Sequence, residues 1–193
     1  MEKKNKELEK KMNELSPDIP HSLQVKKLSF SIFDQLQECH QLDNYARFLL
    51  GGACLLHDLG LTASPTKHHK VSQKMINEIS FHYLDEHEKT LIALIARYHR
   101  KAHPGRKHKG FGNLKNKEKD MVNKLSAIIR VADGLDRDHA SSIKDIKIKK
   151  KGGAWRFILK GGEISETNLY GFNKKKGLLE EIFDCSVEAI WEN

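Results

Sequence analysis

The chain has 193 residues, of which 38% are hydrophobic and 31% are charged, a composition that suits one ordinary folded domain and excludes a disordered tail. Its formal net charge of +8 favours anionic partners. The longest apolar stretch, residues 49–56, is far shorter than the roughly 20 residues of a membrane span, and the charged N-terminus lacks the apolar segment of a secretory signal. Three widely spaced cysteines form no disulfide framework, so we expect a soluble cytoplasmic protein with no membrane partner.

The first two thirds of the sequence show apolar residues at helical spacing. Residues 1–14 alternate in charge and predict a charged helical arm that ends at Ser16-Pro17. Further helices are predicted over residues 21–36, 43–60, 66–79, 88–101 and from 118 through Asp133. Asp43 is expected to cap the second of these helices and Gly60 to end it.

After Ser141 the pattern changes to an alternation of apolar and polar residues, which is typical of strands. Strands are predicted over residues 143–150, 155–159 and 187–191, with a turn at Gly152-Gly153 and a helix over 176–183. The predicted protein is therefore mainly α, with the arm at 1–14, a helical domain at 15–140 and a small α+β tail at 141–193.

Polar residues interrupt the apolar faces of four predicted helices, at His21, His57, His99 and Asp133. Burying an unpaired imidazole or carboxylate costs on the order of several kcal/mol. A hydrogen bond explains one such histidine, whereas a divalent ion between the helices would use the imidazole lone pairs and compensate the carboxylate charge of all four. Asp58 lies about 100° further round the helix than His57, so both side chains can reach one ion.

The order of these residues resembles a known signature. His21, then His57-Asp58 in LLHDLG, then Asp133 in IIRVADGLDR resembles the H…HD…D pattern of the HD superfamily of metal-dependent phosphohydrolases. The finer resemblance is to the C-terminal helical region of the exopolyphosphatase/guanosine pentaphosphate phosphatases (Ppx/GppA). It is carried by LLHDLG (55–60), KHHKVS (67–72), LIALIARYHRKAHP (91–104) and LSAIIRVADGLDR (125–137). From about residue 15 onward the resemblance implies an HD-domain helical bundle with a small C-terminal α+β subdomain.

Two departures from the family pattern limit what the resemblance implies. Val71 stands where the family usually has another histidine, which leaves a second metal site open. The family's N-terminal actin-like domain, to which the resemblance assigns polyphosphate and pentaphosphate hydrolysis in the long proteins, is not expected within these residues. The chain also has no Walker-type phosphate loop. We therefore expect a stand-alone HD region and do not transfer exopolyphosphatase activity to it.

The resemblance and the helical pattern together predict the site. The predicted ligands of a divalent ion (Mn²⁺, Fe²⁺ or Mg²⁺) are His21, His57, Asp58, His69 and Asp133. One ion is expected, imidazoles favour a transition metal, and a second ion remains open. Asp58 and His99 are the predicted catalytic residues, and His69 and His99 could either hold the second ion or protonate the leaving group. Helix phase selects His69 over its neighbour His68.

Residues next to the histidine segments complete the predicted site. Lys67, Lys70, Arg100 and Lys101 are predicted to bind substrate phosphates. For Arg100 and Lys101 the alternative is a solvated helix end, in which a cation meets the C-terminal dipole. Asp136 is a candidate for supporting a ligand, and His139 is expected on the surface.

The leading function is a metal-dependent phosphohydrolase that acts on a nucleotide or another phosphorylated small molecule. The alternative is a non-catalytic module that binds polyphosphate or guanosine tetra- or pentaphosphate. A purely structural helical module is disfavoured by the four polar residues on helix faces. Nucleic acid is not an expected partner, because no aromatic residues interleave with the lysines of residues 101–119. A homodimer is compatible with these features, and none of them specifies it.

Overall fold

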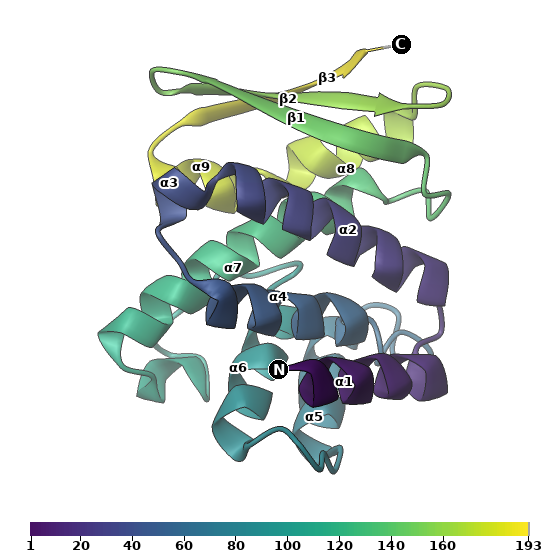
Figure 1. The fold of residues 1–193 in the computed structure, drawn as a ribbon, viewed down its shortest axis with the longest axis vertical. Coiled ribbons are helices and arrows are strands. Elements are labelled where there is room, and N and C mark those ends of the chain that lie inside the picture. Colours follow the sequence, from purple (N-terminus) through teal and green to yellow (C-terminus); the bar gives the residue numbers. More distant parts are fainter. Residues whose placement is uncertain (193) are drawn as a thin grey trace.

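Helices form most of the first 135 residues, and a small sheet closes the C-terminal end of the molecule (Figure 1). The computed structural model describes residues 1–192. The long helices are α1 (Glu2–Leu15), α2 (Ile19–Gln35), α4 (Asn44–Leu56), α5 (His68–Glu78), α6 (Glu86–Arg97) and α7 (Asn116–Leu135). Two short elements, α3 (Gln37–His40) and the 3₁₀ turn η1 (Phe111–Asn113), link them. Within this part of the chain, every helix is too short or too polar to cross a membrane.

Side-chain caps explain where several helices begin. Asp43 accepts a hydrogen bond from the backbone N–H of Ala46, which confirms its predicted role as the cap of α4. Asp85 caps α6 in the same way and exchanges a second hydrogen bond with Glu88. The prediction that α4 continues to Gly60 is wrong, because the helix ends at Leu56 and a turn follows.

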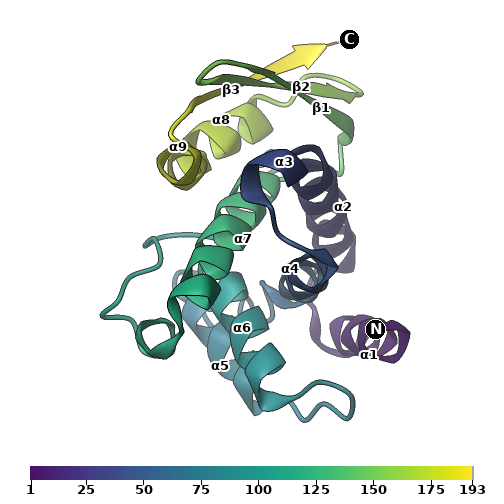
Figure 2. The same cartoon turned by 60° about the vertical axis from the view of Figure 1, so that its left-hand side comes forward.

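The helix α7 is the centre of the helical layer. From Leu125 to Leu135 every residue is buried, because α2, α4 and α6 contact it on one side and α8 and α9 on the other (Figure 2). The helix α1 packs against α4, and its residues Leu8 and Met12 are buried in the shared core. Residues of α2, α4, α6 and α7 therefore meet at the middle of the molecule.

The C-terminal part contains β1 (Ile143–Lys151), β2 (Ala154–Gly161) and β3 (Ser186–Glu192) in the order β1-β2-β3. The first two strands form the predicted antiparallel hairpin, and β3 runs parallel to β2. The helices α8 (Glu166–Lys175) and α9 (Gly177–Phe183) lie between the sheet and α7 (Figures 1 and 2). The sequence pattern predicts α9 but not α8, whose apolar face is interrupted by the buried Asn168 and Gly171.

The edge strand β1 is covered by α2. The Gln24 side chain donates to the carbonyl of Ile143 (2.6 Å), and the Gln35 side chain donates to the carbonyl of Ile146 (2.8 Å). Gln35 also accepts a hydrogen bond from the N–H of Ile148 (2.8 Å). These bonds pair backbone groups that an edge strand would otherwise leave to solvent, and they join the sheet to the helical layer.

Candidate metal centre

His57 and Asp58 lie in the turn that follows α4, and the end of the helix orients the first of them. The Nδ1 atom of His57 donates to the carbonyl of Cys54 (2.8 Å), one of the carbonyls that a helix end leaves unpaired. This bond fixes the tautomer and directs Nε2 into the space between the helices.

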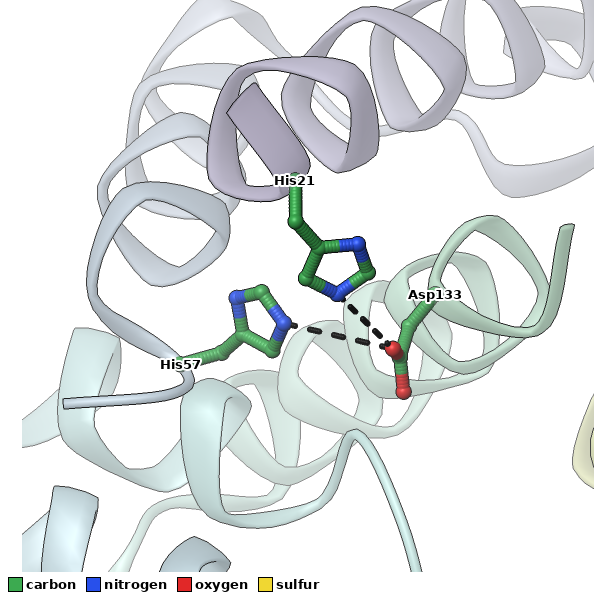
Figure 3. A group of neighbouring side chains, drawn as sticks. All are labelled: His21, His57 and Asp133. Atoms are coloured by element: carbon green, nitrogen blue, oxygen red, sulfur yellow. Dashed lines mark ion pairs between the residues drawn. The ribbon is translucent and has the colours of Figure 1, made fainter. Parts of the chain in front are cut away.

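A first group of ligand atoms comes from α2, the α4 turn and α7. Figure 3 shows His21, His57 and Asp133 pointing toward one another. The Oδ1 atom of Asp133 lies 3.3 Å from Nε2 of His21 and 4.0 Å from Nε2 of His57. The other ring nitrogen of His21 donates to the buried carboxylate of Asp136 (2.8 Å). A ligand histidine typically has such a partner, so Asp136 supports His21, as the sequence suggested.

A second group of ligand atoms consists of Asp58, His68 and His99. The Oδ1 atom of Asp58 lies 3.2 Å from Nε2 of His68 and 3.5 Å from Nε2 of His99. The Nδ1 atoms of these histidines donate to backbone carbonyls, His68 to Pro65 (2.9 Å) and His99 to Ala96 (2.6 Å). Each ring therefore presents its Nε2 lone pair to the same space.

Asp58 joins the two groups. Its second oxygen, Oδ2, lies 3.6 Å from Nε2 of His57 and 3.9 Å from Nε2 of His21, while Oδ1 faces His68 and His99. One carboxylate therefore faces the nitrogens of both groups. If each group held a cation, Asp58 would offer one oxygen to each.

The arrangement fits divalent metal ions. Among residues 1–192, buried Nε2 of His21, buried Nε2 of His57 and buried Oδ1 of Asp58 have no hydrogen-bond partner. The two Nε2 atoms of His68 and His99 face each other at 3.1 Å although the protons of both rings are directed to carbonyls. Separations of 3–4 Å between donor atoms are those expected around an ion with bonds of about 2.1 Å. A cation between these atoms would satisfy all of them.

The contact between the α4 turn and α5 depends on a residue without a side chain. A Cβ atom on Gly60 would lie 2.6 Å from Cβ of Val71 and 2.7 Å from the carbonyl oxygen of His68. The N–H of Gly60 donates to the hydroxyl of Ser72 (2.9 Å). Gly60 therefore allows α5 to approach, and the approach brings His68 to Asp58.

One comparison with known proteins identifies a family for this chain. The family model described as Ppx/GppA phosphatase, domain III, matches residues 4–171, which is most of the chain. The chain belongs to the Ppx/GppA phosphatase domain III family. Comparison with curated proteins finds no significant match. The resemblance to Ppx/GppA is confirmed at the level of the family, and the HD superfamily assignment stays a prediction.

In this Ppx/GppA domain III, burial sets the protonation of the ligand atoms. Burial lowers the pKa of His57 to about 4 and holds the pKa of His99 well below its usual value. Burial opposes ionisation of Asp58, but the imidazoles around it, His57 first, keep the pKa of its carboxyl well below the ordinary range. Neutral imidazoles and an ionised carboxylate are the forms that bind metal, so the site is prepared for a cation near neutral pH.

The structure brings together four of the five predicted ligands, which are His21, His57, Asp58 and Asp133. It does not bring His69 to them. The residue that reaches the site is His68, because α5 begins at this residue and its first turn faces Asp58. His69 is buried outside both groups, and burial lowers its pKa to about 4. The helix phase inferred from the sequence is therefore wrong by one residue.

A cavity of about 320 Å³ opens beside both groups. Of the four basic residues predicted to bind substrate, Arg100 lines this cavity, with its guanidinium 3.0 Å from Nε2 of His68. Lys67, Lys70 and Lys101 are exposed and do not line it. Closeness to the histidines in the sequence therefore does not bring these three lysines to the cavity.

Three residues that the sequence did not suggest complete the walls of the cavity: Arg137, His139 and Lys175. The His139 ring stacks on His21, with ring centroids 3.9 Å apart, and its Nδ1 lies 2.8 Å from Oδ2 of Asp18. The ammonium group of Lys175 pairs with Oδ2 of Asp133. Burial lowers the pKa of Lys175 to about 7. The sequence pattern does not predict α8, and without this helix nothing in the sequence places Lys175 near Asp133.

Arg130 of α7 holds the segment that carries His99. Its guanidinium donates to the carbonyls of Tyr98 and Lys101, each at 3.0 Å. Within residues 1–192 no carboxylate pairs with Arg130, and burial lowers its pKa to about 10. Because the two carbonyls flank His99 and Arg100, the guanidinium fixes the position of both side chains.

Proposed function

We propose that this Ppx/GppA domain III is a metal-dependent phosphohydrolase of the HD type that acts on a nucleotide or another phosphorylated small molecule. The observation that carries the proposal is the pair of histidine–aspartate groups joined by Asp58, with buried ligand atoms that have no other partner. Satisfied core histidines would not leave Nε2 of His21 and Nε2 of His57 unpaired in one place.

Each group would hold one divalent ion, which extends the expectation of a single ion. His21, His57 and Asp133 would hold the first, and His68 and His99 the second, with Asp58 between them. Four imidazoles favour Mn²⁺ or Fe²⁺ over Mg²⁺. Bound divalent ions lower the pKa of a coordinated water and polarise a phosphoryl oxygen, which is the chemistry that phosphoester hydrolysis needs.

The protein's own residues would position the substrate. Arg100 lies against His68 at the cavity wall and would contact a phosphate oxygen with its guanidinium. Asp136 and the carbonyl of Cys54 hold His21 and His57 in one tautomer, so neither ring needs to reorient when a ligand arrives. Among residues 1–192, the cavity is lined by charged side chains, imidazoles and Leu61, a mainly polar lining that supports recognition of the phosphate end.

The proposal is tested on the purified full chain in two steps. Elemental analysis should find a transition metal, and a phosphate-release screen over nucleotides, sugar phosphates and short polyphosphates should find Mn²⁺-dependent turnover. Asp58→Asn, which keeps the size of the side chain, should lose both. A metal content below one ion per chain after Mn²⁺ loading would contradict the proposal. Ligand binding with metal present but no turnover would instead indicate the non-catalytic module that binds polyphosphate or guanosine tetra- or pentaphosphate.

A further inference from the structure

Lys175 lies at the metal centre although it belongs to the C-terminal part of the chain. Its side chain is only 15% exposed, and its ammonium group pairs with Oδ2 of Asp133. The other oxygen of Asp133, Oδ1, faces His21 and His57. Lys175 therefore sits on the cavity side of a ligand carboxylate rather than among the ligand nitrogens. The segment that matches the family ends at residue 171, before this lysine.

A close contact between two helices places Lys175 there. A Cβ atom on Gly171 of α8 would lie 2.2 Å from the carbonyl oxygen of Gly134 in α7. A Cβ atom on Gly134 would in turn lie 2.7 Å from the carbonyl oxygen of Gly171. The two backbones thus touch where Gly134 follows Asp133. Lys175 is one helical turn beyond Gly171 on the same face of α8, so this contact directs it over Asp133.

The charges around the cavity indicate what Lys175 faces. Arg100 and Arg137 also line the cavity, and in the described part of the chain neither forms an ion pair with a carboxylate. Burying a lysine is costly unless its charge is paired, and Asp133 is the partner of Lys175. The side chain also lines the cavity, where a second anion can reach its ammonium group. Two arginines, one lysine and the cations of the proposed centre would together attract a group with several negative charges.

We propose that Lys175 is a substrate-binding residue that contacts the phosphoryl oxygens of the substrate. The C-terminal sheet and its helices thereby complete the phosphate site of the helical layer. This inference rests on the proposed function, because it takes the two groups to hold metal. It adds a residue from α8 whose role is to bind the anion and not the metal.

The test compares Lys175→Met with Lys174→Met in the full chain loaded with Mn²⁺. Both changes replace a lysine of α8 by methionine, but Lys174 is exposed and does not line the cavity. Calorimetric titration with inorganic phosphate measures the anion, elemental analysis measures the metal, and thermal unfolding measures stability. Lys175→Met should weaken phosphate binding about tenfold or more while the Mn²⁺ content stays that of the wild type. Lys174→Met should bind phosphate within about twofold of the wild type.

A conservative variant separates a charge effect from a packing effect. Lys175→Arg keeps the charge, so it should bind phosphate more tightly than Lys175→Met does. Equal phosphate affinity in the wild type and Lys175→Met would overturn the inference and leave the metal centre intact. An equal loss in Lys174→Met would overturn it too, because the effect would then be general attraction. A wild-type chain that binds no Mn²⁺ would overturn the proposed function first, and this inference with it.

Discussion

Two buried histidines, His21 in the first turn of α2 and His40 at the end of α3, have different surroundings. His40 donates from Nε2 to the carbonyl of Phe33 (2.8 Å) and accepts at Nδ1 from the N–H of Leu42 (2.9 Å). His21, in the first turn, donates from Nδ1 to Asp136, but its Nε2 has no hydrogen-bond partner. Both side chains are almost completely buried, at 1% and 0% exposed. Burial alone therefore does not distinguish a structural histidine from a ligand, and neither does an unpaired nitrogen alone, since Nδ1 of His69 is also buried and unpaired. What distinguishes His21 is that its unpaired Nε2 lies among other ligand atoms.

The same contrast extends to the neighbours of each histidine. Around His40, the ammonium group of Lys124 donates to the carbonyl of His40 (3.2 Å) and also pairs with Asp120 (2.7 Å), so this neighbour is paired as well. Around His21, the Nε2 atom of His57 and the Oδ1 atom of Asp58 remain unpaired. An unpaired buried polar group costs about 1–3 kcal/mol. A ligand that satisfies such groups binds the folded state, so metal should stabilise the end of α2 that holds His21.

The largest effect is expected when the carboxylate shared by both groups loses its charge. Asp58→Asn should lower the Mn²⁺ content of the loaded chain to near zero, because each group keeps its nitrogens but loses the anion between them. The rise in melting temperature on adding Mn²⁺ should disappear as well. Elemental analysis and thermal unfolding with and without Mn²⁺ measure both effects. Full Mn²⁺ content in this variant would remove Asp58 from the centre.

A smaller loss is expected when one imidazole of the second group is removed. His68→Ala should reduce the Mn²⁺ content from two ions to about one per chain, since the first group does not contain His68. His69→Ala is the matched control, because His69 is buried next to His68 but lies in neither group. Metal titration of the two variants side by side compares them. If His69→Ala loses the second ion and His68→Ala keeps it, then His69 and not His68 is the ligand.

Arg130 is a buried residue whose hydrogen bonds go to backbone carbonyls, as the one donated by His40 does, so its loss should affect stability more than metal binding. Arg130→Met keeps much of the side-chain volume but leaves the carbonyls of Tyr98 and Lys101 without their donor. It should lower the free energy of unfolding by about 2–4 kcal/mol, measured by urea denaturation. Metal at the first group should survive, because among residues 1–192 the hydrogen bonds of Arg130 go to Tyr98 and Lys101 and to none of the group's three residues. If Arg130→Met lost all metal and kept its stability, the assignment of Arg130 to a structural role would be wrong.

The smallest effect is expected at His40 itself. His40→Asn should cost about 1–2 kcal/mol of stability through lost hydrogen bonds and leave the Mn²⁺ content unchanged. A lower Mn²⁺ content in this variant would mean that metal binding depends on His40.

The same variant tests the direction in which the stability contribution of His40 changes with pH. Burial lowers the pKa of His40 in the folded chain below its unfolded value of about 6.5. The unfolded chain then binds more protons, so the contribution of neutral His40 is complete above this value and is lost as the pH falls toward the lower, folded pKa. The difference in unfolding free energy between wild type and His40→Asn should therefore be smaller at about pH 5 than at about pH 7.5. A larger difference at the lower pH would show that the folded state favours the charged ring.

Much of the fold is predictable from local patterns. Helical spacing predicts α2, α4, α6 and α7, and alternation with Gly152-Gly153 predicts the β1–β2 hairpin. The extent of α4 is not predictable in this way, because apolar spacing continues into a turn whose residues are buried as well. Apolar spacing does not predict α8, because its inner face carries Gly171, where a close backbone contact with Gly134 leaves no room for an apolar side chain.

The sequence by itself indicated that His21, His57 and Asp133 point inward, because apolar spacing places each of them on the inner face of its segment. That these residues and Asp58 belong to one site was implied by the resemblance. Only the tertiary structure decided that His68 and not His69 joins them, since one residue turns a helix by about 100° and the start of α5 depends on its contact with Gly60. The same holds for Lys175. Its place over Asp133 comes from the touching backbones of Gly134 and Gly171, which lie far apart in the chain and carry no pattern that spacing could reveal.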